Sequence, residues 1–427
     1  MLRKILQKKL KTLSRDILQA HKPEIIGITG SVGKTTTKEA VATVLKSRFT
    51  IRASYKNYNN EIGLPLTVVG TQSPGRSLAG WLTVFKKAKK IISDSKAVYP
   101  EMLVLEMGID HPGDMDYLTS IAKPSRVIIT RLGRAHVEFF SSVHELHQEK
   151  LKLAKSLPEE GILIYNFEDE IVRAACSDLK VRMISYGVSD RADVRATNIS
   201  LHISADSTEV GMRFKLEYDG SVVPVFIPGL ISRPSLLAAL AAAAVGFSYD
   251  FNGIEVAGAL HNFRLPPGRM NLIAGKQNTL IIDDTYNSSP EAATESLLTI
   301  SELPREQYNK SWAILGDMRE LGKESKSAHM QIGLACVEKK LDHLVTVGEE
   351  AKYISQSAQD AGMDAEHIHH FPDSITAAEF LEKYITERDL ILVKGSQAVR
   401  MEKIVKQLMK NPEQASELLV RQGIEWD

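Results

Sequence analysis

The chain has 427 residues, of which 43% are hydrophobic and 25% charged, proportions typical of a globular protein with enough core for about two or three domains. Lys and Arg number 53, as do Asp and Glu, so the net charge argues against a general attraction to nucleic acid. Two cysteines are too few for a disulfide scaffold or a cysteine metal site, and no uncharged apolar stretch of about 18 residues predicts a membrane span; we therefore expect a cytoplasmic protein.

Residues 1–24 are expected to form a basic amphipathic helix. Apolar residues recur close to helical spacing from Leu2 to Leu18, with Lys and Arg between them, and they lack the continuous apolar run of a signal peptide. Such a helix can lie on an anionic membrane surface or contact a partner. We favour packing of its apolar face on the body of the protein itself. A second basic segment, residues 71–100, has no function that its sequence reveals.

Residues 25–264 are expected to form one α/β domain. Short apolar runs alternate with helical patterns, which predicts a mostly parallel sheet covered on both faces. Residues 191–228 alternate in polarity around a Gly-containing turn and predict a small antiparallel section. A hinge-like segment at 259–270 contains Pro266-Pro267-Gly268, and the alternating series that follows predicts a Rossmann-like domain over residues 265–427.

A glycine-rich turn follows the first predicted strand, where residues 27–40 read GITGSVGKTTTKEA. Its glycines let backbone N–H groups turn toward an anion at the positive end of the next helix, which indicates a central P-loop ATPase-like domain. Lys34 would reach the β- and γ-phosphates of a nucleotide, and the Thr35 hydroxyl would bind Mg²⁺. An ordinary strand-to-helix turn is the alternative, because the strict spacing requires glycine where Ile28 stands. The residues expected to contact the nucleotide are Thr29, Gly30, Ser31, Gly33, Lys34, Thr35 and Thr36.

Polar side chains at the ends of other predicted strands are further candidates. Glu106 ends an apolar strand, where a carboxylate can meet the metal of a bound nucleotide, although a buried structural glutamate is the alternative. Asp283 and Asp284 end a strand of the second domain; a carboxylate there can accept hydrogen bonds from ribose, and Asp284 can equally cap a helix. Other polar groups near strand ends are Asp317, Glu320, Lys394, Ser396 and Arg400, the last three suited to a carboxylate or phosphate.

Several separated motifs together resemble the Mur ligase family, and within it the MurF-type branch. The resemblance runs from about Ile25 to about Met409, nearly the whole chain. The phosphate loop alone indicates only a nucleotide, and it is the set in its order that is specific. The motifs are TGSVGKTTTKE, NYNNEIGLPLTV, LEMGIDHPGDMDYLTSI, AHVEFFSS with the later EK, DDTYNSSPEA, LGDMRELGKES with His329, and ILVKGSQAVRMEK.

The resemblance implies a monomeric, ATP-dependent ligase of peptidoglycan precursor synthesis. Its small-molecule substrates would be D-Ala-D-Ala and a UDP-N-acetylmuramoyl-tripeptide, whose carboxylate is activated as an acyl phosphate. Two Mg²⁺ ions are implied, the first bound by Thr35 and Glu106 and the second by His136. A lone His and a helical Lys would not be singled out by physics alone. The resemblance makes Lys150 a carbamylated lysine that supports metal binding.

The same resemblance assigns roles to other matching residues. Lys34, Lys150 and His136 would be catalytic. Arg269, Asp284 and Asn287 would contact the nucleotide on the side of the second domain. The residues implied to bind the substrates are Asn59, Asn60, Glu61, Asp317, Glu320, Lys394 and Ser396.

Three departures from the family pattern keep other interpretations open. Arg131 follows Thr130 where the family usually has Asn, and the segment 232–235 reads SRPS instead of a Gly-Arg-His-Asn-like helix start. The family's enzyme also has an N-terminal domain that grips UDP, whereas 24 residues precede the first strand here. One alternative is a ligase that acts on a non-UDP carboxylate. The other is a nucleotide-dependent binding or scaffold protein.

Overall fold

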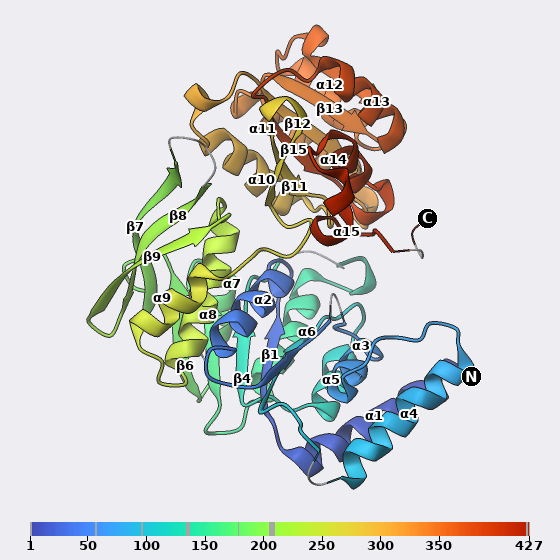
Figure 1. The fold of residues 1–427 in the computed structure, drawn as a ribbon, viewed down its shortest axis with the longest axis vertical. Helices are drawn as coiled ribbons and strands as arrows, with labels where there is room; N and C mark the ends of the chain where they lie inside the picture. Colours follow the sequence, from blue (N-terminus) through green and yellow to red (C-terminus); the bar gives the residue numbers. More distant parts are fainter. Residues whose placement is uncertain are drawn as a thin grey trace. The chain divides into compact units, whose positions relative to one another are not determined.

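The computed structural model describes residues 2–55, 58–94, 97–133, 137–177, 179–204, 210–423 and 426, and it divides into two units (Figure 1). The first unit is formed by residues up to 204 together with 211–228 and 235–264. The second consists mainly of residues 265–427. Each unit has its own sheet and its own hydrophobic core.

The sheet of the first unit has nine strands within the described residues, in the order β2-β3-β1-β4-β5-β6-β7-β8-β9. Neighbouring strands from β2 to β7 pair in parallel, which confirms the predicted α/β class. The predicted antiparallel section is present as β8 and β9, joined by Asp219-Gly220, whose positive φ angles suit a two-residue hairpin turn. β7, which was also expected in that section, neighbours β8 in the strand order and pairs in parallel with β6 on its other side. The bounds are β1 Glu24–Thr29, β2 Ile51–Ala53, β3 Met102–Glu106, β4 Arg126–Ile129, β5 Ile162–Asn166, β6 Arg182–Gly187, β7 Val194–Ile203, β8 Val210–Tyr218 and β9 Ser221–Pro228.

The central strands are apolar along their length, which is the pattern of a parallel sheet covered on both faces. In β1, for example, Ile26 and Ile28 are fully buried, and both α2 and α6 contact this strand. The register sets Ile28 beside Glu106 of β3, so the loop after β1 emerges next to that carboxylate. The helices of the first unit are α1 Leu2–His21, α2 Lys34–Leu45, α3 Gly63–Val69, α4 Leu78–Ser93, α5 Asp114–Ile121, α6 Val143–Lys155, α7 Glu170–Cys176, α8 Arg233–Phe247 and α9 Gly253–His261.

Helix α1 packs on the first unit, as predicted. Leu10 and Ile17 on its apolar face are fully buried and Leu13 nearly so, within the same core cluster as the residues of α3, α4 and α5 that α1 contacts. In Figure 1, α1 and α4 lie side by side. Across the described ranges, no helix combines the length and the hydropathy that crossing a bilayer requires.

The sheet of the second unit has six strands within the described residues, in the order β10-β11-β15-β12-β13-β14. β10 is antiparallel to β11, and the other neighbours pair in parallel, so the carboxyl ends of β11, β12 and β15 meet at one edge. The strands are β10 Asn271–Ala274, β11 Leu280–Asp284, β12 Ser311–Gly316, β13 His343–Val347, β14 Ile368–Phe371 and β15 Leu390–Lys394. The helices are α10 Pro290–Glu302, α11 Ser325–Glu338, α12 Lys352–Asp360, α13 Ser374–Tyr384, α14 Glu402–Leu408 and α15 Ala415–Leu418.

Candidate active site

The loop between β1 and α2 has the backbone geometry of an anion site. Gly30 and Gly33 adopt φ angles of 145° and 88°, and a Cβ atom built on Gly30 would lie 2.1 Å from the Thr130 Oγ1 atom. Gly33 is the N-cap of α2 and has no side chain to accept a hydrogen bond from the first turn. The backbone N–H groups of that turn therefore point out of the helix without a capping side chain. This end of a twelve-residue helix can therefore receive a phosphate.

Two lysines converge on the loop. The Lys34 Nζ atom donates to the Gly30 carbonyl at 2.7 Å, and the Lys150 Nζ atom, from α6, donates to the Ser31 hydroxyl at 2.6 Å. Lys150 is only 2% exposed. Burial, with a smaller contribution from the nearby Lys34 charge, lowers the pKa of Lys150 to about 7. An appreciable part of the Lys150 population is thus a neutral amine at neutral pH.

A buried carboxylate faces the first turn of α2. The Thr35 hydroxyl donates to Glu106 Oε2 at 2.9 Å, and Asn59 Nδ2 donates to Glu106 Oε1 at 3.0 Å. Glu106 is 2% exposed. The structure therefore brings the predicted metal ligands Thr35 and Glu106 together, and it adds Asn59, for which the family resemblance implies substrate binding.

Thr29 and Thr36, also predicted to contact the nucleotide, lie on the elements that flank the loop. Thr29 ends β1 and its Oγ1 atom is buried without a hydrogen-bond partner in the described structure. Thr36 is buried in the first turn of α2. His136 lies outside the described residues. Within those residues there is no group of three or more His, Cys, Asp or Glu side chains that could hold a metal ion.

Two predicted substrate residues form hydrogen bonds with other residues of the first unit. Asn60 accepts hydrogen bonds from the backbone N–H groups of Ile62 and Gly63 at the start of α3. Glu61 accepts from Arg3 at 2.7 Å and from Gln7 at 3.0 Å, both on α1. These contacts connect the segment that follows Asn59 to the N-terminal helix.

In the second unit, predicted residues gather where β11 and β15 end. The Lys394 Nζ atom forms a 2.6 Å ion pair with Asp284 Oδ2 and donates to the Asn287 carbonyl at 3.1 Å. Ser296 on α10 donates to the same Asp284 oxygen. Because both contacts use Oδ2, the Oδ1 atom of Asp284 has no hydrogen bond to any described residue and can accept one from a ligand.

Asp317 and Ser396 lie at the same edge of this sheet. Asp317 is fully buried, and its Oδ1 atom accepts from the backbone N–H groups of Glu350 and Ala351. Ser396 accepts from the Arg319 N–H at 2.9 Å. Glu320 is exposed and has a positive φ of 64°. Of the three predicted residues Asp317, Ser396 and Glu320, only Glu320 is exposed to solvent.

The hinge-like segment is held by the strand-end residue Asp283. Asp283 accepts from the Gly268 N–H at 3.1 Å and from the Thr285 hydroxyl at 2.6 Å, and burial raises its pKa to about 7. The Arg269 guanidinium lies 4.0 Å from the centre of the Tyr286 ring, and its Nε atom is buried without a partner among the described residues. Arg269 thus retains a donor that a ligand can use.

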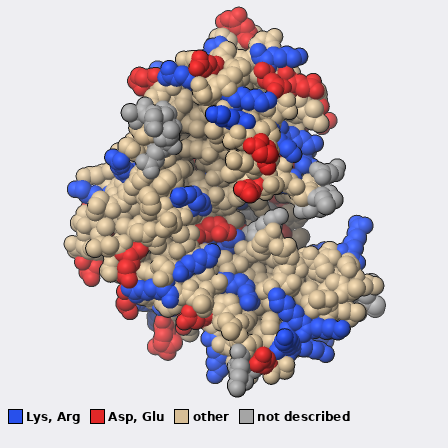
Figure 2. Space-filling view, in the orientation of Figure 1, with Lys and Arg blue, Asp and Glu red and all other residues tan. Residues whose placement is uncertain are grey.

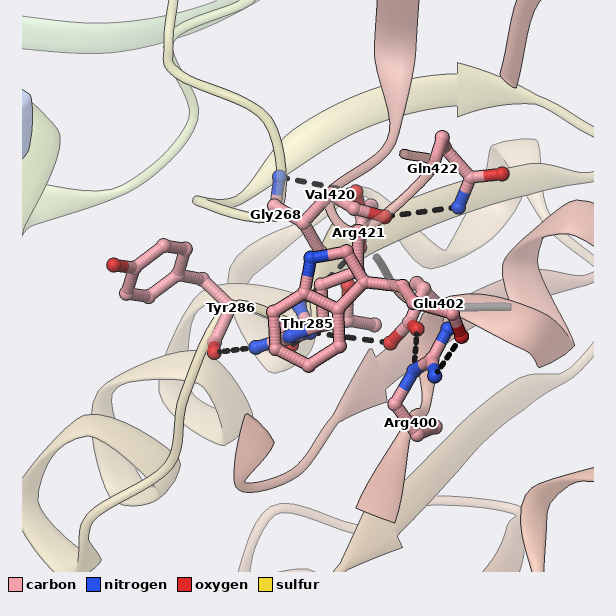
Figure 3. Close-up of polar contacts among 10 residues, drawn as sticks. Gly268, Thr285, Tyr286, Arg400, Glu402, Val420, Arg421 and Gln422 are labelled. Atoms are coloured by element: carbon pink, nitrogen blue, oxygen red, sulfur yellow. Dashed lines mark hydrogen bonds and ion pairs between the residues drawn. The ribbon is translucent and has the colours of Figure 1, made fainter. Parts of the chain in front are cut away.

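A C-terminal segment that includes Arg421 contacts the loop that follows β11, at Thr285 and Tyr286. The sequence did not predict this contact. Arg421 donates to the backbone carbonyls of Thr285 and Tyr286 and to Glu402, which also accepts from Arg400 at 2.5 Å (Figure 3). The side chains of Arg421 and Glu402 are 5% and 0% exposed. No local motif marks Arg421, because its partners lie far away in the sequence.

Residues 28–75 and 87–245 match the Mur ligase middle domain, which includes the phosphate loop, Glu106 and Lys150. Residues 268–397 match the Mur ligase glutamate ligase domain, which includes Arg269, Asp284 and Lys394.

Individual relatives match over most of the chain. The chain is 28% identical over 403 residues to the UDP-N-acetylmuramoyl-tripeptide--D-alanyl-D-alanine ligase of Bacillus subtilis strain 168, covering 94% of this chain and 79% of that one. It is 30% identical over 392 residues to the enzyme of the same name from Escherichia coli K12, covering 91% and 77%. A crystal structure of MurF ligase from Thermotoga maritima in complex with ADP superposes with a TM-score of 0.77 and 26% identity, covering 96% and 84%.

Proposed function

This chain belongs to the Mur ligase family and is an ATP-dependent ligase that forms amide bonds, and we propose from this premise that it joins D-alanyl-D-alanine to a UDP-N-acetylmuramoyl-tripeptide. The support for these substrates is that the Bacillus subtilis and Escherichia coli relatives carry this activity in their names and align over 94% and 91% of the chain. The resulting product is a precursor of peptidoglycan.

One observation carries the proposal. A single loop with positive-φ glycines leads into Lys34 and the start of α2, and it is accompanied by the Thr35–Glu106 contact and the Lys150–Ser31 contact. An ordinary strand-to-helix turn would have no need to bury an amine and a carboxylate beside it, because each costs desolvation free energy. A nucleotide phosphate with its metal would interact favourably with both groups.

The proposed reaction has two steps. A carboxylate oxygen of the tripeptide attacks the γ-phosphorus of ATP, and the bond from that phosphorus to the β–γ bridging oxygen breaks, which gives an acyl phosphate and ADP. The amine of D-Ala-D-Ala then attacks the acyl carbon, the amide bond forms, phosphate leaves and the amine loses a proton. Lys34 stabilises charge on the transferred phosphoryl group.

The residues present fit the first implied metal. The Thr35 hydroxyl and the Glu106 carboxylate are hard oxygen donors of the kind that Mg²⁺ prefers, and they already lie within 2.9 Å of each other. When bound there, Mg²⁺ would neutralise charge on the phosphates. For the second ion, His136 and Lys150 remain the implied residues.

Lys150 fits carbamylation on chemical grounds. The unprotonated amine is the form that adds to CO₂, and a pKa of about 7 supplies that form at neutral pH. The addition of the neutral amine to CO₂ forms an N–C bond and releases one proton, so the neutral side chain becomes an anion, which is suited to metal support.

The strand-end groups of the second unit are proposed to bind the nucleotide and the substrates. Asp284 Oδ1 and the Arg269 Nε atom are unused polar atoms, suited to ribose and to phosphate or base respectively. Asn287 completes the nucleotide side. The proposed substrate residues are Asn59, Asn60, Glu61, Asp317, Glu320, Lys394 and Ser396.

We place the reaction in the cytoplasm. Cys176 and Cys336 are both buried free thiols, which suits a reducing compartment.

The proposal is tested by a coupled assay of ADP release. We expect release only when the UDP-linked tripeptide and D-Ala-D-Ala are both present, and release that needs neither substrate would refute a ligase. A parallel reaction with the same tripeptide lacking UDP tests the acceptor, since equal rates would show that UDP is not recognised.

Two variants test the loop in the same assay. Lys34→Ala should lower turnover by about a hundredfold or more, because a charge that stabilises the transition state is lost. Lys46→Ala, at the exposed end of the same helix, is the matched control and should leave turnover unchanged.

A further inference from the structure

The positive charge of the chain is concentrated on two helices. α1 carries six Lys and Arg residues and one acidic residue, and α4 carries four lysines and no acidic residue. Because Lys plus Arg equals Asp plus Glu in the whole chain, the rest of the protein carries a negative surplus of the same size. Such an asymmetry within a neutral chain indicates a surface for an anionic partner.

The two helices form one continuous surface, which we call the α1/α4 surface. Lys9 of α1 lies 4.0 Å from the centre of the Phe85 ring of α4, and His21 contacts the Ile91 carbonyl at 2.9 Å. The opposite sides of both helices are buried, at Leu10 and Ile17 on α1 and at Val84 and Ala88 on α4. The remaining faces of α1 and α4 therefore turn outward together.

Most basic side chains of this surface take no part in holding the fold. Arg3, Lys11 and Lys87 do contact protein groups, at Glu61, Ser120 and the Gly70 carbonyl. Figure 2 shows Lys and Arg side chains gathered over the part of the molecule that α1 and α4 occupy in Figure 1. The basic side chains that are exposed and have no hydrogen bond or ion pair with a described residue are Lys4, Lys8, Arg15, Lys86, Lys89 and Lys90.

Exposed aliphatic side chains accompany these charges. Leu78 and Leu82 of α4 are 79% and 59% exposed, and Ile5 of α1 is 58% exposed. At helical spacing, Leu78, Leu82, Lys86 and Lys89 share one face of α4. Lysines beside outward leucines are the composition of a helix that lies in the interface of an anionic bilayer.

We propose that the α1/α4 surface docks on a membrane that contains anionic phospholipid, with α4 lying in the plane of the interface. The lysines attract the lipid phosphates, and Leu78 and Leu82 enter the boundary between headgroups and acyl chains. Nucleic acid would satisfy the charges but not the leucines, and the aromatic residues Trp81 and Phe85 of α4 are packed against the core cluster. The membrane accounts for both features.

The test is co-sedimentation of the full chain with lipid vesicles. We expect binding to phosphatidylcholine vesicles with about one-third phosphatidylglycerol, no binding to pure phosphatidylcholine, and release by added salt. The double variant Lys86→Glu/Lys89→Glu should lower the partition coefficient by about tenfold or more. Leu78→Ala/Leu82→Ala should lower it by about fivefold without a change of charge.

A matched control separates position from net charge. Lys406→Glu/Lys410→Glu makes the same change in charge at two exposed lysines of the second unit, and it should leave the partition coefficient unchanged. Unaltered ADP release would show that the variants fold. Three results would each overturn the proposal. They are equal losses of vesicle binding in the two double lysine variants, failure of the parent chain to bind anionic vesicles, and binding to single-stranded RNA in place of vesicles.

Discussion

Lys150 and Asp283 are ionisable side chains that the fold removes from water, and burial moves each pKa toward neutrality. Lys150 is 2% exposed and its pKa is lowered to about 7, whereas Asp283 is fully buried and its pKa is raised to about 7. Burial costs free energy in the charged form of each group. In the proposed carbamate role of Lys150, this cost favours the neutral amine, which is the form that reacts with CO₂.

The variant Lys150→Met separates the stability of the fold from its activity. Between pH 7 and the ordinary lysine pKa, the unfolded chain holds a proton that the folded chain has lost, so the free energy of unfolding of the parent rises with pH in this window. Lys150→Met should remove that rise. In CO₂-depleted buffer at pH 7 it should also raise the free energy of unfolding by about 1 kcal/mol or more, net of the lost Ser31 hydrogen bond.

The same variant should reduce ADP release by at least about a hundredfold, because no carbamate can form. The measurements are urea denaturation at several pH values and the coupled assay. Lys155→Met, at an exposed position later in α6, is the control for both and should change neither. Full activity in Lys150→Met would exclude the carbamate.

The sequence predicted the candidate site unevenly. Lys34, Thr35 and Glu106 could be proposed from residue types and strand ends, since the turn geometry is local and β1 and β3 are apolar runs. Lys150 could be proposed only from the resemblance, because a helical lysine is ordinarily solvated. The link from Glu61 to Arg3 was not foreseen, because no short-range signal relates two residues that far apart.

At the scale of elements, the loop between β1 and α2 depends on its two glycines for different reasons. A Cβ atom on Gly30 would meet Thr130 Oγ1 at 2.1 Å, whereas the nearest atom to a Cβ on Gly33 is 3.9 Å away. The Thr130 hydroxyl is itself fixed by a 2.7 Å hydrogen bond to the Val32 carbonyl. Glycine is therefore required at position 30 both by the lack of space for a Cβ atom and by the positive φ angle. At position 33 it is required by the positive φ angle alone.

We accordingly expect Gly30→Ala to be the more damaging variant. Gly33→Ala should cost about 1–2 kcal/mol of backbone strain and weaken nucleotide binding modestly. Gly30→Ala should abolish detectable binding of a fluorescent ADP analogue, because relieving the clash displaces the loop. Titration of the two purified variants decides the order, and tighter binding by Gly30→Ala than by Gly33→Ala would contradict this account.

The C-terminal segment supports the proposed nucleotide loop through Arg421. Arg421→Met removes the donors to the Thr285 and Tyr286 carbonyls and one partner of buried Glu402. We expect a loss of about 2 kcal/mol in the free energy of unfolding, limited because Arg400 still pairs with Glu402. The KM for ATP should rise more than kcat falls, because the loop would contact bound ATP but take no part in the chemical step.

Arg305→Met provides the comparison for Arg421→Met. Arg305 pairs with Asp342 at the surface, where both side chains are at least 40% exposed, and such pairs contribute less than about 1 kcal/mol. Steady-state kinetics with varied ATP, together with denaturation, distinguishes the two sites. An unchanged KM for ATP in Arg421→Met would remove the proposed support.

For the whole molecule, the two units have separate cores. The second unit has its own sheet and a core cluster that includes Trp312, Ile314 and Val393. Trp312 is 2% exposed, and its Nε1 atom donates to Asp389 Oδ2 at 2.9 Å. A unit with its own core can in principle fold alone.

We therefore expect residues 265–427, expressed as a fragment, to unfold cooperatively in urea. In a Trp426→Phe background, the fluorescence of Trp312 should be blue-shifted in the folded fragment and shift to the red across the transition, because its ring leaves the core. A Trp312→Phe fragment, which lacks the signal, identifies its source. A gradual change without a transition would show that this unit depends on the rest of the chain.

By itself the sequence determined the α/β class, the alternation of strands and helices, the glycine-rich turn after β1 and the buried face of α1, since hydrophobic period and glycine placement act over short distances. Only the tertiary structure decided that Asn59 joins Glu106, that Lys150 meets Ser31, that Arg421 holds Tyr286, and that α1 and α4 form one basic surface. Those contacts depend on strand order and packing, which bring together residues that are far apart in the sequence. No local sequence pattern indicates such a distant partner.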